Sequence, residues 1–78
     1  MRQEAMEAFI RRLADLLDKD PAELAPDTEL AQFNTWDSLA AVSVTAMADV
    51  EYDRKLTAAA ILSCRTVRDL YDLCDGES

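Results

Sequence analysis

Asp37-Ser38-Leu39 is the tripeptide in this chain whose residue types and spacing best fit a chemical role. It stands at the entry to an amphipathic segment, so we expect the serine hydroxyl to be exposed at the amino-terminal end of a helix. The helix dipole and the unpaired backbone N–H groups there would favour a phosphate attached to that oxygen. Because the tripeptide also occurs by chance in many proteins, its surroundings decide what it means.

The composition gives other chemistry little support. The chain has no histidine, which removes the commonest general base and the commonest metal ligand. Cys64 and Cys74 form no C-x-x-C pair, so we expect no zinc or redox site and treat both as small buried apolar side chains. An enzyme would also need a nucleophile–base pair, and the sequence suggests none.

The net charge is −8, from eight Lys and Arg against sixteen Asp and Glu. This charge repels phosphate backbones and anionic membranes, so we expect no nucleic-acid partner and no membrane insertion. It suits basic protein partners, although acidity is also an ordinary route to solubility. No apolar run is long enough to cross a bilayer. Two thiols without a signal peptide suggest a reducing cytoplasm.

The 78 residues suffice for one small domain, and abundant Ala, Leu, Asp and Glu favour an all-α fold. A first helix is expected from about Gln3 to Lys19. Its apolar residues recur every three or four positions: Met6, Phe9, Ile10, Leu13, Leu16 and Leu17. Asp20-Pro21 should end it, because the residue before a proline avoids the α region, and Asp20 can cap a short turn over residues 21–24.

Residues 25–36 lose this periodicity and form a long loop, which we expect Leu24, Leu30 and Phe33 to anchor on the core. Trp36, at the end of the loop, could fill the core or contact a bound group or a partner. The sequence leaves both roles open for this side chain.

The second helix should span about Ser38 to Tyr52, with Asp37 or Ser38 as its N-cap. At about 100° per residue it carries two apolar stripes on opposite sides. The first stripe holds Ala41, Val44, Ala48 and Tyr52, and the second holds Leu39, Val42, Ala46 and Val50. Either the helix is central and covered on both sides, or the second stripe is a docking surface that begins beside Ser38.

Two shorter helices complete the predicted bundle. Thr57 should cap a third helix over about residues 58–63, and Thr66 a fourth that runs to about Cys74 and stops at Asp75-Gly76. The inner face of the fourth helix should hold Val67, Leu70, Tyr71 and Cys74.

These features together resemble the acyl carrier protein family, including the related peptidyl carrier domains. The stretch from Trp36 to Val42 is similar to the attachment motif of the family, and residues 49–52 resemble the acidic, aromatic-ended close of its second helix. The resemblance covers nearly the whole chain. It implies a four-helix carrier bundle with a long first loop and a short third helix, in one domain over residues 1–78 that acts as a monomer.

The resemblance further implies that Ser38 accepts 4′-phosphopantetheine from coenzyme A, delivered by a phosphopantetheinyl transferase. The terminal thiol would carry an acyl or aminoacyl group as a thioester to activating and transferring enzymes. The chain itself would catalyse no reaction. The residues expected to meet these partners are Trp36, Asp37, Leu39, Val42, Ala46, Asp49 and Val50.

The chain also departs from the family pattern. Trp36 stands where many members have Gly or Leu, Ser43 where many carry a glutamate, and Val50 where an acid is usual. We therefore expect partner recognition to depend on the apolar stripe more than on charge. The alternative function is an acidic helical interaction module whose Ser38 is never modified. The small side chains of Ala58, Ala59 and Ala60 could leave room for cargo or simply allow close packing, and the sequence favours neither.

Overall fold

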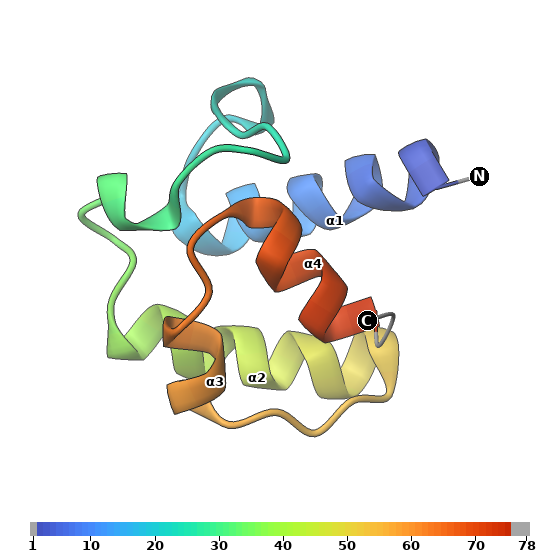
Figure 1. Cartoon of the computed structure of the whole chain (residues 1–78), viewed down its shortest axis with the longest axis vertical. Coiled ribbons are helices and arrows are strands. Elements are labelled where there is room, and N and C mark those ends of the chain that lie inside the picture. Colours follow the sequence, from blue (N-terminus) through green and yellow to red (C-terminus); the bar gives the residue numbers. More distant parts are fainter. Residues whose placement is uncertain (1, 76–78) are drawn as a thin grey trace.

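The structure, a computed structural model, describes residues 2–75, and within that range helices joined by loops make up the fold, as Figure 1 shows. This confirms the predicted all-α bundle with four helices, a long first loop and a short third helix. The α-helices are α1 (Arg2–Leu17), α2 (Ser38–Tyr52), α3 (Ala58–Leu62) and α4 (Val67–Asp75). Two 3-10 turns lie in the first loop, η1 (Pro21–Glu23) and η2 (Leu30–Gln32).

The end of α1 differs from the prediction, which carried the helix to Lys19 and stopped it at Asp20-Pro21. The helix ends at Leu17, because Asp18 takes a left-handed conformation with φ 60°. The Lys19 N–H then donates to the Ala14 carbonyl at 2.8 Å, which closes the last turn in the Schellman pattern. Asp20 does cap η1 as predicted, accepting the Ala22 N–H at 3.0 Å.

The core is built where α1, α2 and α4 meet, with α4 lying between the other two in Figure 1. Phe9 is at its centre and is fully buried, with its ring edge-on to Tyr71 at 5.4 Å and to Tyr52 at 6.0 Å. The other large side chains that are fully buried are Leu13, Leu17, Leu30, Val44, Ile61, Val67, Leu70 and Cys74. The predicted inner face of α4 is confirmed.

The long loop is fastened to the segment that leads into α4. Its three predicted anchors, Leu24, Leu30 and Phe33, are all buried. Backbone hydrogen bonds join the two segments: Leu30 N–H to Arg65 O at 2.8 Å, Val67 N–H to Thr28 O at 3.0 Å and Arg68 N–H to Pro26 O at 2.8 Å. These bonds pair the backbone groups of the two segments and fix the loop that leads to Ser38.

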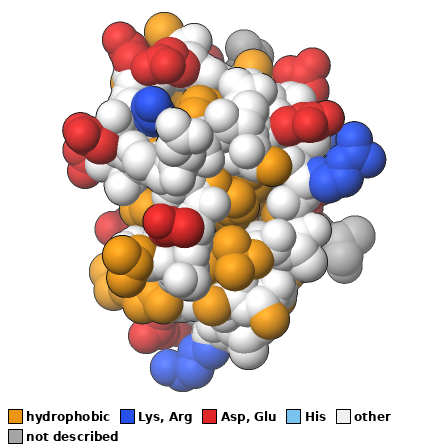
Figure 2. All heavy atoms as spheres, turned by 90° about the vertical axis from the view of Figure 1, so that its left-hand side faces the viewer, with side chains coloured by type: hydrophobic (Ala, Val, Ile, Leu, Met, Phe, Trp, Pro, Cys, Tyr) orange, Lys and Arg blue, Asp and Glu red, His pale blue; other side chains and the backbone are white. Residues whose placement is uncertain are grey.

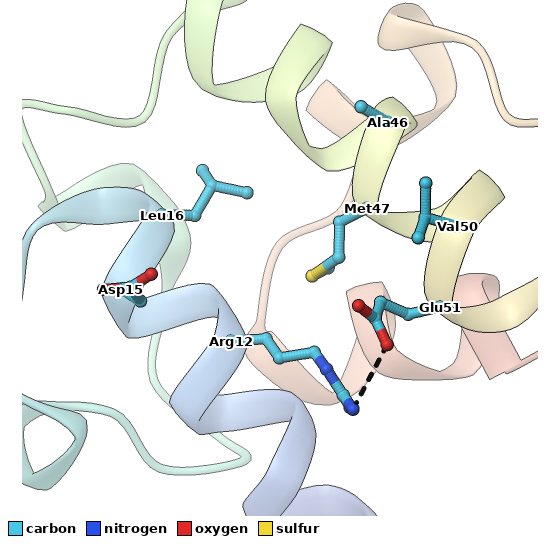
Figure 3. Close-up of a pocket in the computed structure, with 7 residues that line it drawn as sticks. All are labelled: Arg12, Asp15, Leu16, Ala46, Met47, Val50 and Glu51. Atoms are coloured by element: carbon cyan, nitrogen blue, oxygen red, sulfur yellow. Dashed lines mark ion pairs between the residues drawn. The ribbon is translucent and has the colours of Figure 1, made fainter.

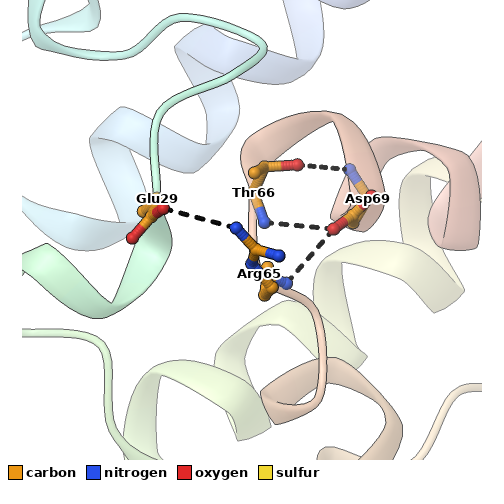
Figure 4. Close-up of polar contacts among 4 residues, drawn as sticks. All are labelled: Glu29, Arg65, Thr66 and Asp69. Carbon is orange, nitrogen blue, oxygen red and sulfur yellow. Dashed lines mark hydrogen bonds and ion pairs between the residues drawn. The ribbon is translucent and has the colours of Figure 1, made fainter.

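A reciprocal cap begins α4 at the same place. The Asp69 N–H donates to Thr66 Oγ1 at 3.2 Å, and Asp69 Oδ2 accepts the backbone N–H groups of Thr66 and Arg65, each at 3.3 Å. The Arg65 guanidinium pairs with Glu29 across the junction at 3.5 Å (Figure 4). Thr66 is therefore the cap that the sequence predicted. The helix runs through Asp75, one residue beyond the predicted end at Cys74, and Gly76 of the predicted stop Asp75-Gly76 lies outside the described residues.

The third helix packs mainly on α2. Thr57 caps it as predicted, accepting the Ala60 N–H at 3.1 Å, and Ile61 is fully buried. The helix ends at Leu62, one residue before the predicted end at Ser63. Over residues 2–75, none of the helices has the length and apolar character needed to span a membrane.

Candidate functional site

The helix that carries the candidate serine is capped by the residue before it. Asp37 has an extended backbone, and its Oδ1 accepts the Ala40 N–H at 3.0 Å while its carbonyl accepts the Ala41 N–H at 3.0 Å. Asp37 is therefore the N-cap, and the prediction that left Ser38 as an alternative cap is resolved. Ser38 is the first helical residue, and it is exposed.

The position of Ser38 suits a phosphate ester. The first N–H groups of an α-helix have no acceptor inside the helix. Asp37 takes the N–H of Ala40, which leaves those of Ser38 and Leu39 for solvent or a bound anion. The positive end of the helix dipole favours negative charge at the same point.

Trp36 is half-buried and packs against the core just ahead of this site. The backbone N–H of Trp36 donates to the Phe33 carbonyl at 3.1 Å, so the loop reaches Asp37 with a fixed backbone. The side chain thus serves as an anchor for the loop while part of it remains at the surface, two residues before Ser38 in the chain.

The two apolar stripes of α2 have opposite surroundings. Ala40, Ala41, Val44 and Ala48 are buried in the core. The outer stripe is open to solvent, since Leu39, Val42 and Val50 are 77%, 57% and 79% exposed and Ala46 is exposed as well. The alternative in which α2 is covered on both sides is therefore wrong for this chain.

Leu62 of α3 is also exposed, at 41%, and the sequence analysis missed it. Ile61 and Leu62 are adjacent on a short helix, so when Ile61 is buried Leu62 must point away from the core. The adjacency of these two apolar residues on a short helix could therefore have predicted from the sequence that one of them is exposed. Figure 2 shows apolar side chains gathered on the lower half of the face that carries the start of α2 and α3.

The acids retained on α2 are engaged within the chain. Asp49 Oδ1 pairs with Lys55 Nζ at 3.4 Å, and Glu51 Oε1 pairs with Arg12 Nη2 at 3.3 Å. The Asp37 carboxylate caps the helix. Less free negative charge is thus available to a partner than the sequence alone suggests.

The two thiols differ in environment. Cys74 is fully buried, as predicted, whereas Cys64 is only half-buried, because α3 ends before it and leaves it at the edge of the core. Burial raises the pKa of Cys74 to about 12 and also raises the pKa of Cys64. Both are poor nucleophiles at neutral pH. In the described part of the chain, no cluster of three His, Cys, Asp or Glu side chains could hold a metal ion.

Comparison with known proteins places the chain in a family. Residues 7–74 match the family described as the phosphopantetheine attachment site, which is most of the chain. The chain therefore belongs to this family of acyl and peptidyl carrier proteins, and its prosthetic group is covalently bound 4′-phosphopantetheine. Carrier domains of this kind are non-catalytic, and they interact with a modifying transferase and with biosynthetic enzymes. Neither the curated proteins nor the solved structures give a significant match.

Proposed function

We propose that this chain is a carrier protein that holds acyl or aminoacyl intermediates as thioesters on a 4′-phosphopantetheine arm attached to Ser38. The observation that carries the proposal is the division of roles at the start of α2. Asp37 supplies the cap, so the exposed hydroxyl of Ser38 is left for modification. The bound arm supplies the thiol that forms the thioester.

Attachment requires little of the carrier beyond this geometry. Ser38 Oγ forms a bond to the phosphorus of the pantetheine phosphate in coenzyme A, adenosine 3′,5′-bisphosphate leaves, and the hydroxyl proton passes to a base on the transferase. The free N–H groups of Ser38 and Leu39 favour the resulting phosphodiester. Asp37 directly precedes Ser38 in the chain, so its carboxylate would also meet the metal or basic groups of the transferase.

Partners dock on the outer stripe of α2 in this proposal. The stripe consists of Leu39, Val42, Ala46 and Val50, with Trp36, Asp37 and Asp49 beside it. Its exposure and the internal pairing of the nearby acids support recognition through apolar contact. The exposure of Leu62 extends the same kind of surface onto α3.

We also propose that the chain works as one monomeric domain over residues 1–78 in a reducing cytoplasm, where its two free thiols would stay reduced. The cargo is an acyl or aminoacyl group of a biosynthetic pathway.

Intact mass after incubation with coenzyme A and a promiscuous transferase tests the attachment. Wild type and Ser43→Ala should gain one phosphopantetheine, whereas Ser38→Ala should gain none. Ser43 is the matched control because it is an exposed serine on the same helix. An unchanged mass for folded wild-type protein would instead favour the acidic interaction module without a prosthetic group.

A further inference from the structure

The indole of Trp36 carries a hydrogen-bond donor that the fold does not use. Trp36 is the one tryptophan of the chain, it is half-buried against the core, and it stands two residues before Ser38. We propose that its indole N–H binds the phosphodiester that joins the arm to Ser38 and so fixes the base of the arm. The inference rests on the proposed attachment at Ser38.

The indole N–H is free and open to solvent. None of the hydrogen bonds within residues 2–75 uses it as a donor. A buried polar atom without a partner is costly, and the described residues contain no buried side-chain nitrogen or oxygen of that kind. The indole nitrogen of Trp36 therefore lies at the surface, although much of the ring is covered. A tryptophan N–H usually finds a partner when its ring is buried, so this donor is available for an acceptor from outside the chain.

The backbone between Trp36 and Ser38 directs the two side chains to the same side. Asp37 is extended, with φ −140° and ψ −170°. Residues on either side of an extended residue share a face of the chain, and their Cα atoms are at most about 7 Å apart. The backbone N–H of Trp36 is itself bonded to the Phe33 carbonyl at 3.1 Å, which holds the indole in place. A phosphate on the Ser38 oxygen therefore leaves the chain on the side that carries the indole.

The sequence around Ser38 offers a phosphate no cation. Residues 20–53 contain neither Lys nor Arg, and the carboxylate of Asp37 adds a negative charge next to the serine. The Arg12 guanidinium does reach α2, but it pairs with Glu51 at 3.3 Å near the other end of that helix (Figure 3). Neutral donors must therefore stabilise the phosphodiester. The indole N–H adds one to the free backbone N–H groups at the start of α2, and hydrogen bonds to an anion are stronger than those between neutral groups.

Binding the phosphate in this way costs little conformational entropy. The ring of Trp36 already packs against the core, so few of its rotamers are lost when the phosphate binds. The arm then leaves the domain from a fixed base, while its remaining length stays free to move between partner enzymes. Trp36 thus anchors the loop with its ring and the arm with its N–H.

The test follows the single indole N–H signal in the proton–nitrogen correlation spectrum of the full chain. Intact mass is measured first, and a wild type that gains no phosphopantetheine would overturn the attachment and this inference together. In loaded protein, the indole proton should move downfield and exchange with water about fivefold more slowly than in the unmodified protein. Ser38→Ala should give the same indole signal before and after the transferase reaction. An unchanged indole signal in loaded wild type would overturn this inference alone.

A variant without the donor locates the acceptor. Trp36→Phe keeps an aromatic ring to pack against the core and removes the N–H, so the phosphorus resonance of its loaded form should differ from that of wild type. Tyr52→Phe is the matched control, because it removes a polar atom from another half-buried aromatic side chain at the far end of α2, and its phosphorus resonance should match wild type. Equal phosphorus resonances in Trp36→Phe and wild type would show that the indole does not bind the phosphate.

Discussion

The Asp37 carboxylate accepts the Ala40 N–H at 3.0 Å and so takes the capping role from Ser38, the residue that opens α2. Serine is itself a common N-cap, and its hydroxyl would then be engaged with the helix backbone. Shifting the cap by one residue leaves that hydroxyl at the positive end of the helix and open to solvent. The proposed attachment at Ser38 depends on this division between neighbouring residues.

Replacing the cap should weaken the domain measurably. Asp37→Ala leaves the Ala40 N–H without its acceptor and should lower the free energy of unfolding by about 1 kcal/mol. Asp37→Asn keeps a side-chain oxygen and should stay within a few tenths of a kcal/mol of wild type. Urea denaturation monitored by circular dichroism compares the three proteins. Equal stability of Asp37→Ala and wild type would show that the hydrogen bond contributes nothing.

The buried thiol of Cys74 should make the protein less stable in alkali. Burial raises its pKa from 9.0 to about 12, so the unfolded chain loses this proton at lower pH than the folded chain. The contribution is complete below about pH 9 and is lost as the pH rises toward 12, with a slope of up to about 1.4 kcal/mol per pH unit. Denaturation curves between about pH 8 and about pH 10.5 measure it. Cys74→Ala should decline less steeply, and parallel curves for the two proteins would refute this origin.

Arg12 ties α1 to the end of α2 through Glu51 and Tyr52. Its guanidinium lies 3.3 Å from Glu51 and 5.9 Å from the centre of the Tyr52 ring. The side chains of the ion pair are about two-fifths exposed, so a double-mutant cycle of Arg12→Ala with Glu51→Gln should give a coupling of only about 0.2–1 kcal/mol. Arg11→Ala, at the neighbouring exposed position, is the control and should couple to Glu51 by less. A coupling near zero would show that the pair contributes nothing to the stability of the fold.

Partner recognition should respond to the apolar stripe rather than to charge. Leu39→Ala or Val50→Ala should lower kcat/KM for modification by the transferase by about tenfold, because each removes an exposed apolar contact. Asp49→Asn should change it by less than about twofold, since Asp49 already pairs with Lys55. Raising the salt from about 50 mM to about 500 mM should have a similarly small effect. A steep loss with salt would show that charge governs docking.

Local sequence signals were sufficient for much of the fold. Asp20, Thr57 and Thr66 each cap the turn or helix that they were expected to cap, because a capping bond depends on residues only two or three positions away. The outer and inner stripes of α2 were also predictable, since helical periodicity places Val42 and Val44 on different sides.

Features set by distant contacts could not be predicted in this way. Asp18 ends α1 in a left-handed conformation, which a glycine at that position would have predicted but an aspartate does not. The bonds from Leu30 and Val67 that hold the long loop use backbone groups, which every residue possesses, so no pattern marks them. The open hollow between α1 and α2, lined in part by Leu16 and Met47, exists only because the two helices pack together, so neither helix alone predicts it.

The most direct test of the carrier role is fragmentation mass spectrometry of the wild-type protein after the transferase reaction. The account predicts that the phosphopantetheine group is found on Ser38 and that fragments containing Ser43 or Ser63 without Ser38 keep their unmodified mass. Finding the group on another serine, while Ser38 remains unmodified, would contradict it.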